Sequence, residues 1–208
     1  MPIHVVTIAR TLGAGGEDVG RAVAADLGFA YADDEIISAA AERAGVSTAT
    51  IEKAEQRPGL IARILDSMGS VPIDPSIYYG QALALPATDA PAGYDELIRD
   101  VIVGTANRGK VVIVAHGSGI CLAGAPGVLR VFVTATPEAR AARVATATGT
   151  DAERTAKAVA DSDNQRADFL KRFYNVKQEL PTHYDLVLNT DMLTAADAAK
   201  LVVSAVRM

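Results

Sequence analysis

A glycine-rich segment between a short apolar run and an amphipathic stretch constrains the fold of this chain more than any other feature. Residues 3–8 are mostly β-branched, as in a buried strand, and apolar residues recur at four-residue steps across 17–27, as on one face of a helix. Residues 9–16 join the two and contain three glycines. This order places backbone N–H groups and a helix N-terminus around a small space, which is an arrangement that binds anions.

The segment departs from the phosphate-binding pattern G-x-x-x-x-G-K-[ST] where the lysine and the hydroxyl residue belong. Gly16 stands where the pattern has lysine, and Glu17 stands where it has serine or threonine. The site therefore lacks one positive charge and gains a negative one. Arg10, just before the glycines, can supply a compensating guanidinium, a group that suits phosphate well. The alternative for Glu17 is that it holds Mg²⁺ directly, as carboxylates do.

We expect a bound phosphate to contact the loop and the first residues of the helix. Glycine permits the positive φ angles and the close backbone approach that such a loop needs. The acidic residues that follow suit a helix N-terminus, although they would repel a bound phosphate. The alternative is an ordinary strand-to-helix turn. The residues assigned to this site are Gly13, Ala14, Gly15, Gly16, Glu17 and Asp18.

Composition limits the class of protein and its partners. A chain of 208 residues, half of them hydrophobic, suits one compact domain with a sizeable core. A net charge of −5 and an aromatic content of 5% argue against a nucleic-acid-binding surface. No apolar run approaches the roughly 20 residues that span a bilayer, and strand-like residues begin too early for a signal peptide. A single cysteine fits the reducing cytoplasm, where we expect the protein to be located.

Apolar runs of strand length alternate with helical patterns along most of the chain. This alternation predicts βαβ units and a parallel sheet flanked by helices, which is an α/β fold. Ligands of such sheets bind at the carboxyl ends of the strands, where the glycine loop is expected. The predicted strands are 3–8, 29–31, 111–115, 128–133 and 185–189. The predicted helices are 17–27, 34–44, 47–56, 59–68, 94–107, 137–147, 151–172 and 194–206.

Two polar residues that follow predicted strands are candidates for binding the second substrate. Asp33 follows the strand at 29–31, and His116 follows the strand at 111–115. Both are therefore expected at the ligand-binding edge of the sheet. The alternative for Asp33 is to cap the next helix, and the alternative for His116 is a structural hydrogen bond.

Arginines can neutralise the charge of a phosphate during its transfer. Arg143 lies near the end of one predicted helix and Arg166 lies on the next. Asp163 is one turn before Arg166, so we expect Asp163 to orient it. Arg10, Arg143 and Arg166 are the residues assigned to catalysis. The alternative for any one of them is a solvated helix face.

Several segments, taken together, resemble the cytidylate kinase-like family among the P-loop nucleoside monophosphate kinases. Residues 8–16, Ile-Ala-Arg-Thr-Leu-Gly-Ala-Gly-Gly, are similar to the opening ISRxxGSGG of that family. The matches keep their order and spacing over nearly the whole chain. The other matching segments are 27–33, 112–117, 129–143, 163–166 with 171–174, and 184–190 with 193–194.

The resemblance implies a P-loop NTPase fold of three α/β/α layers around a five-stranded parallel sheet. It implies a helical nucleotide-binding insert at about 45–95 and a lid at about 143–175, within one domain of residues 1–208. It also implies transfer of the ATP γ-phosphoryl group to CMP or a similar small acceptor, with ATP and Mg²⁺; no residue is assigned as a metal ligand. The family shares the missing lysine, but Glu17 and His116 stand where it has arginines.

Three functions follow from these observations. The first is a kinase that binds a small-molecule nucleotide, with no nucleic-acid or membrane partner. The second is a non-catalytic nucleotide or phospho-ligand sensor on the same fold, which the residues at Glu17 and His116 favour. The third is an interaction module that works through the proline-rich segment 69–93. The sequence leaves open the acceptor and the oligomeric state, a homo-oligomer included.

Overall fold

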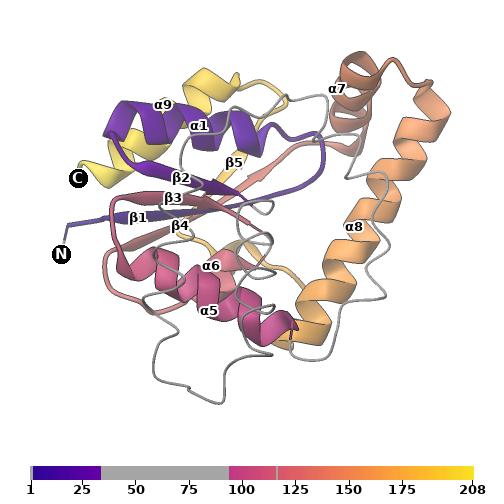
Figure 1. Ribbon diagram of the computed structural model, residues 1–208. Coiled ribbons are helices and arrows are strands. Elements are labelled where there is room, and N and C mark those ends of the chain that lie inside the picture. Colours follow the sequence, from indigo (N-terminus) through magenta and orange to yellow (C-terminus); the bar gives the residue numbers. More distant parts are fainter. Residues whose placement is uncertain (1, 34–93, 116) are drawn as a thin grey trace, which may run out of the picture.

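The computed structural model describes residues 2–33, 94–115 and 117–208, and these contain a five-stranded parallel sheet (Figure 1). The strand order is β2-β3-β1-β4-β5, so the first strand lies at the centre. All four pairings are parallel, which confirms the predicted α/β fold. The strands are β1 (Val5–Arg10), β2 (Ala30–Asp33), β3 (Val111–Val114), β4 (Val128–Thr134) and β5 (Leu186–Asn189).

Helices cover both faces of the sheet, which gives the three expected layers. In Figure 1, α1 and α9 lie above the sheet, α5 and α6 lie below it, and α7 and α8 stand at the carboxyl ends of the strands. None of the described helices is both long and apolar enough to cross a membrane. The helices are α1 (Gly16–Leu27), α5 (Tyr94–Asn107), α6 (Ser118–Cys121), α7 (Pro137–Thr148), α8 (Ala152–Tyr174) and α9 (Ala195–Val206), with a 3-10 turn, η1 (Pro181–His183).

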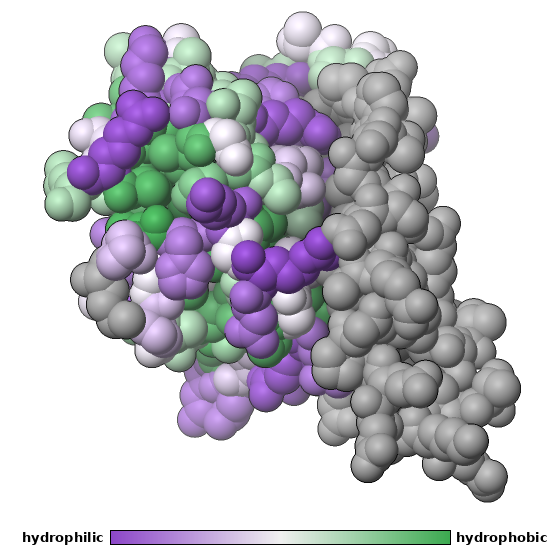
Figure 2. Space-filling model, turned by 60° about the vertical axis from the view of Figure 1, so that its left-hand side comes forward, coloured by the Kyte–Doolittle hydropathy of each residue, from purple (hydrophilic) through white to green (hydrophobic). Residues whose placement is uncertain are grey.

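The two central strands account for the near-continuous apolar runs of the sequence. Every residue of β1 and of β3 is buried, because helices cover both faces of the sheet. Successive side chains enter opposite layers: Val6 and Ile8 pack toward α1 and α9, whereas Val5 packs toward α5. On the side where the strands begin, hydrophobic residues form a green area among hydrophilic side chains (Figure 2).

The described elements follow the predicted ones, except at the end of the first strand. β1 starts and ends two residues later than the predicted strand 3–8, because it runs from Val5 to Arg10. Ala9 and Arg10 stay extended because they pair with Phe132 and Val133 of β4, a partner that local pattern does not reveal. The short α6 and η1 were not predicted. The helices predicted at 34–44, 47–56 and 59–68, the segment 69–93 and nearly all of the expected insert lie outside the described residues.

An ion pair near the amino ends of β4 and β5 gives the fold an acid-sensitive contact. Arg130 donates to Asp185 from Nε at 3.0 Å and from a terminal nitrogen at 2.6 Å. The hydrogen bond from the Arg130 side chain lowers the pKa of the Asp185 carboxyl below its ordinary value. A carboxyl with a lower pKa in the folded state adds stability above its unfolded pKa, and this is lost as the pH falls through the folded pKa.

We therefore expect Asp185→Asn to lower the free energy of unfolding at pH 7 by up to about 1 kcal/mol, because the pair is partly exposed. The difference from the wild type should shrink as the pH falls below about 4. Urea denaturation at pH 7 and at pH 3 measures both values. A difference that is the same at the two pH values would contradict the assignment.

Candidate functional site

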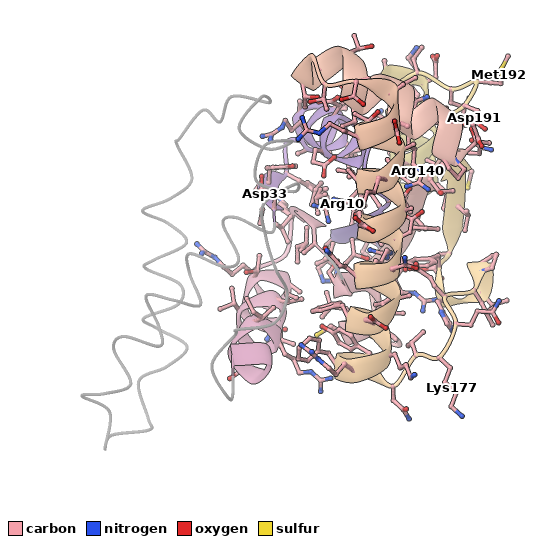
Figure 3. All side chains as sticks on the ribbon, turned by 90° about the vertical axis from the view of Figure 1, so that its right-hand side faces the viewer. Arg10, Asp33, Arg140, Lys177, Asp191 and Met192 are labelled. Atoms are coloured by element: carbon pink, nitrogen blue, oxygen red, sulfur yellow. The ribbon has the colours of Figure 1, made fainter. Side chains whose placement is uncertain are left out.

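The candidate site lies where the carboxyl ends of the strands meet the glycine loop. Figure 3 looks onto this edge and shows α8 running across it. Arg10 and Asp33 lie on one side of α8 in this view, and Asp191 and Met192 lie on the other. The edge therefore brings together the first two strands, the glycine loop and the loop after β5.

The glycine loop has a backbone that only glycine adopts easily at two positions. Gly13 and Gly15 have φ angles of +79° and +78°, in the left-handed region. Gly13 also lies against α7: a Cβ there would be 2.6 Å from the carbonyl oxygen of Arg140. Gly13 therefore both turns the loop and lets its backbone pack closely against α7.

Three consecutive carbonyl groups of the loop accept hydrogen bonds from outside the loop. The Leu12 carbonyl accepts from Arg140 at 3.3 Å, and the Gly13 carbonyl accepts from Arg143 at 3.2 Å. The Ala14 carbonyl accepts from the buried hydroxyl of Thr190 at 2.9 Å. The two arginines are three residues apart on α7, so they lie on one face of that helix. Donors on α7 and after β5 thus fix the orientation of the loop peptides.

This orientation prepares the opposite side of the loop for an anion. In a trans peptide the C=O of one residue and the N–H of the next point in opposite directions. With the Leu12 and Ala14 carbonyls held from outside, the N–H groups of Gly13 and Gly15 point away from those donors. The start of α1 follows directly, and no described side chain caps it. The loop and the helix start therefore offer donors and a positive dipole end to a negative group.

Arg10, the predicted substitute for lysine, lies beside the start of α1. It is the last residue of β1, is 6% exposed and donates from Nε to Glu17 at 2.7 Å. The Arg10 side chain begins where a side chain at position 16 would have to lie, because a Cβ on Gly16 would be 2.5 Å from the Arg10 Cβ. Glycine at position 16 therefore permits this position of Arg10.

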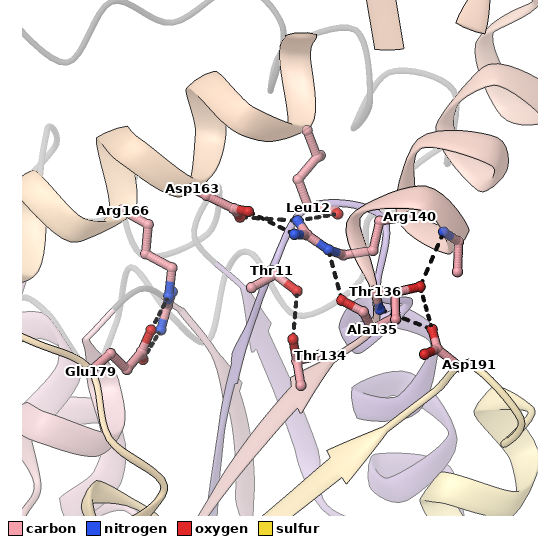
Figure 4. A network of polar contacts seen from close by, with 11 residues as sticks. Thr11, Leu12, Thr134, Ala135, Thr136, Arg140, Asp163, Arg166, Glu179 and Asp191 are labelled. Carbon is pink, nitrogen blue, oxygen red and sulfur yellow. Dashed lines mark hydrogen bonds and ion pairs between the residues drawn. The ribbon is translucent and has the colours of Figure 1, made fainter. Parts of the chain in front are cut away.

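Two other arginines hold α8 in place through carboxylates (Figure 4). Arg140 of α7 donates to Asp163 at 2.9 and 2.6 Å, and Arg166 of α8 donates to Glu179 at 2.8 and 2.5 Å. The expectation that Asp163 orients Arg166 was wrong, because Asp163 lies against α7 and Arg140 is its partner. Each of these contacts uses two guanidinium nitrogens on one carboxylate, the strongest geometry for this pair.

The Arg166 network also reaches the first strand. Arg166 donates to the Arg10 carbonyl at 3.3 Å and lies over the Phe132 ring, 5.4 Å from its centre. The Tyr184 hydroxyl donates to Glu179, and burial raises the pKa of Tyr184 above its ordinary value. The predicted catalytic arginines thus occupy three places: Arg10 at the start of α1, Arg143 behind the loop and Arg166 between α8 and β1.

Of the two predicted acceptor residues, one lies at the end of β2 and the other lies outside the described part. Asp33 ends β2, is fully buried and has its Oδ2 atom 3.8 Å from Arg21 of α1. Arg21 also lies over the Tyr31 ring, 4.7 Å from its centre. Asp33 therefore reaches the expected edge of the sheet, facing α1. His116 lies outside the described residues.

Carboxylates at the start of α1 are the nearest candidates for a cation. Burial, and then the neighbouring Glu17, raise the pKa of Asp18 above its ordinary value. Within residues 2–33, 94–115 and 117–208, no three His, Cys, Asp or Glu residues gather closely enough to hold a metal ion. The protein alone therefore offers no complete metal site in this part of the chain.

A shallow pocket lies on the side of α7 that carries Arg143. Its volume is about 340 Å³, and Ala142, Arg143, Thr146 and Ala147 line it. Arg143 also donates to the Thr190 hydroxyl at 3.0 Å and to the Thr190 carbonyl. The pocket is therefore linked through Arg143 both to the glycine loop and to the loop after β5.

A family model described as "Cytidylate kinase-like family" matches residues 5–192. The chain belongs to this family. The match contains the glycine loop, both arginine-bearing helices and Thr190, so it spans every part of the site described above. This membership supports a phosphotransferase of the nucleotide kinase type.

Solved structures of other proteins confirm the fold of this chain. An uncharacterised protein from Eubacterium ventriosum ATCC 27560 has a TM-score of 0.68 and 16% identity, with 100% of this chain and 99% of that chain covered. Shikimate kinase from Bacteroides thetaiotaomicron has a TM-score of 0.52 and 14% identity, covering 99% of each chain. Shikimate kinase from Acinetobacter baumannii, in complex with shikimate, has a TM-score of 0.52 and 13% identity, covering 99% and 93%. No curated protein sequence matches the chain.

Sequence reasoning singled out Arg143 for catalysis, but it missed Arg140, Thr190 and Glu179 and did not foresee that Arg143 supports the loop. Arg140 and Arg143 have the three-residue spacing of one helix face, so this signal was available. Thr190 directly follows the last strand, at the ligand edge of the sheet. Glu179 lies between α8 and η1 and has no periodic pattern that would indicate its role.

Proposed function

We propose that this protein transfers the γ-phosphoryl group of ATP to a (deoxy)cytidine monophosphate-like acceptor. The observation that supports it best is the glycine loop: its carbonyls at positions 12–14 accept from outside, while the N–H groups of Gly13 and Gly15 and the start of α1 are directed to the other side. Backbone N–H groups at a helix N-terminus bind phosphate oxygens. Membership in the cytidylate kinase-like family supports the choice of acceptor.

In this proposal the protein contributes position and charge, since phosphoryl transfer needs little covalent chemistry from the enzyme. The N–H groups of Gly13, Gly15 and Gly16 hold the donor phosphates, and Arg10 adds a positive charge there. Arg143 and Thr190 keep the loop in its binding conformation. Arg166 approaches the phosphates only if its contact with Glu179 opens. Asp33 and His116 lie toward the acceptor.

The pocket beside Arg143 suits the base of the donor nucleotide. The guanidinium of Arg143 contacts the loop that would hold the phosphates, and the side of its helix lines the 340 Å³ pocket. A planar guanidinium can stack on an aromatic base. The donor nucleotide would then pass around the end of the glycine loop, from the side of the Gly13 and Gly15 N–H groups to the side of Arg143.

Mg²⁺ fits this site as a companion of the nucleotide. Mg²⁺ is usually held by one or two carboxylates together with substrate phosphates and water. Asp18, in the first turn of α1, stands beside the proposed phosphate position and would provide such a carboxylate, since Glu17 already accepts from Arg10. Bound there, the ion would neutralise charge on the phosphates during transfer.

A radiometric transfer assay with ATP, Mg²⁺ and a panel of nucleoside and deoxynucleoside monophosphates tests the proposal. We expect turnover with CMP or dCMP, and a higher melting temperature in ATP because a ligand stabilises the state that binds it. Shikimate, a non-nucleotide acceptor, is the negative control. Transfer to none of these nucleotides would refute the proposal of a nucleotide kinase.

A second function is nucleotide binding without transfer. It is favoured by the internal contacts of the basic residues: Arg140, Arg143 and Arg166 all donate to protein groups, and Arg10 contacts Glu17. Calorimetry separates the two functions, because this alternative requires ATP to bind while no acceptor is phosphorylated. Absence of binding to any nucleotide would exclude both.

A further inference from the structure

Arg10 and Gly16 share one space beside the start of α1. A Cβ atom on Gly16 would lie 2.5 Å from the Cβ and 2.8 Å from the Cγ of Arg10. Non-bonded carbon atoms do not approach this closely in proteins, so one of the two residues would have to move. A lysine at position 16 and the present position of Arg10 therefore exclude one another.

Glu17 holds Arg10 in a different way from the other buried arginines. Arg140 and Arg166 each place two guanidinium nitrogens on one carboxylate. Glu17 instead accepts from Nε of Arg10, the nitrogen next to the stem, at 2.7 Å. A contact at this nitrogen fixes the direction in which the rest of the guanidinium points. The side chain of Glu17 is itself mostly buried, at 18% exposure, which limits its own freedom.

The departures from the phosphate-binding pattern at positions 16 and 17 thus both affect the side chain of Arg10. The glycine at position 16 makes room for Arg10, and the acid at position 17 orients it. Arg10 is also fixed at its backbone, because its carbonyl accepts from Arg166 and its strand pairs with β4. With its backbone fixed and its Nε held by Glu17, the Arg10 side chain is preorganised, which is what stabilisation of a transferred phosphate requires.

We propose that Glu17 is a positioning residue that holds Arg10 across Gly16, so that Arg10 supplies the positive charge that a lysine at position 16 would otherwise supply to a nucleoside triphosphate. This inference rests on the proposed function and names the groups that carry the charge at its donor site. The positive charge should therefore be transferable from position 10 to position 16 only when both residues are changed together.

The first test replaces Glu17 by alanine and by glutamine. We expect Glu17→Ala to lower kcat by about 100-fold, because the guanidinium is no longer held where charge develops. The Kd for ATP should stay the same or fall, because a negative charge has left the site. Glu17→Gln keeps an oxygen acceptor for Nε and should recover part of kcat. An unchanged kcat would overturn the inference, and so would recovery of Glu17→Ala by raised Mg²⁺, which would identify a metal ligand.

The second test relocates the charge and uses tripolyphosphate binding, so it does not depend on the acceptor. Arg10→Gly should weaken binding by about 10-fold or more, as expected for loss of a charged hydrogen-bond donor. Adding Gly16→Lys to Arg10→Gly, which also removes the Cβ atom at position 10, should restore most of that loss. Gly16→Lys alone should not strengthen binding, because Arg10 occupies the space. A double variant that binds no better than Arg10→Gly would overturn the inference.

Asp185→Asn is the matched control, because it removes a partner of an arginine far from the loop. It should leave both kcat and tripolyphosphate binding unchanged. A wild-type protein that binds neither ATP nor tripolyphosphate would refute the proposed function and this inference with it. A wild type that binds both, with Glu17 and Arg10 variants that behave like it, would overturn the inference alone.

Discussion

Replacing Glu179 by alanine is expected to lower the free energy of unfolding by about 3 kcal/mol, because it leaves the buried Arg166 without its carboxylate. The Arg166 side chain is only 5% exposed, and its contact with Glu179 uses two nitrogens. The partners that remain are neutral: the Arg10 carbonyl, the Tyr184 hydroxyl and the Phe132 ring. Neutral groups do not offset the cost of keeping a charge out of water.

Urea denaturation of the single and double variants measures this effect. Glu179→Gln keeps hydrogen-bond acceptors and should lose less stability than Glu179→Ala. Adding Arg166→Met to Glu179→Ala should return part of the stability, because an apolar side chain needs no partner. A loss below about 1 kcal/mol for Glu179→Ala would mean that water replaces the carboxylate.

Apart from substitutions at Arg10, Gly16 and Glu17, the largest effect on activity is expected for Thr190→Val. This substitution removes one hydroxyl and keeps the shape of the side chain. That hydroxyl donates to the Ala14 carbonyl and accepts from Arg143, so its loss releases the glycine loop on two sides. We expect phosphoryl transfer to fall by about 100-fold, since a small displacement of positioning groups has effects of this size. Stability should fall by only about 1–3 kcal/mol, the cost of a buried group without its hydrogen bond.

Thr190→Ser is the control for this prediction, because it retains the hydroxyl and loses only a methyl group. It should keep most of the activity. Steady-state kinetics with both variants, together with their melting temperatures, separate loss of loop position from loss of fold. Equal activity of the valine and serine variants would contradict the role of the hydroxyl.

Much of the fold could be predicted because its signals are local. β3 and β4 are continuous or near-continuous apolar runs, and α7 and α8 begin directly after Thr136 and Asp151, whose side chains cap them. The end of β1 could not be predicted in this way. Arg10 is extended because a strand more than 100 positions later pairs with it, and no local pattern reports such a partner.

The candidate site shows the same division. The glycine loop was found from its composition and its place between a strand and a helix, whereas the contacts of its arginines were not. Asp163 lies one turn from Arg166, yet it pairs with Arg140 of the neighbouring helix. Spacing along one helix lists the possible partners, but packing of α7 against α8 decides which one is reached.

By itself, the sequence determined the alternation of strands and helices and the place of the glycine loop, because side-chain periodicity and glycine act over a few residues. The order and spacing of its motifs indicated the family, which the family model confirms. The tertiary structure alone decided that Gly16 leaves room for Arg10 and that Glu17 accepts a hydrogen bond from it. It also decided that Arg140, Arg143 and Thr190 hold the loop from outside. These depend on which atoms come within hydrogen-bond distance when distant segments pack, and that distance is set by the whole fold.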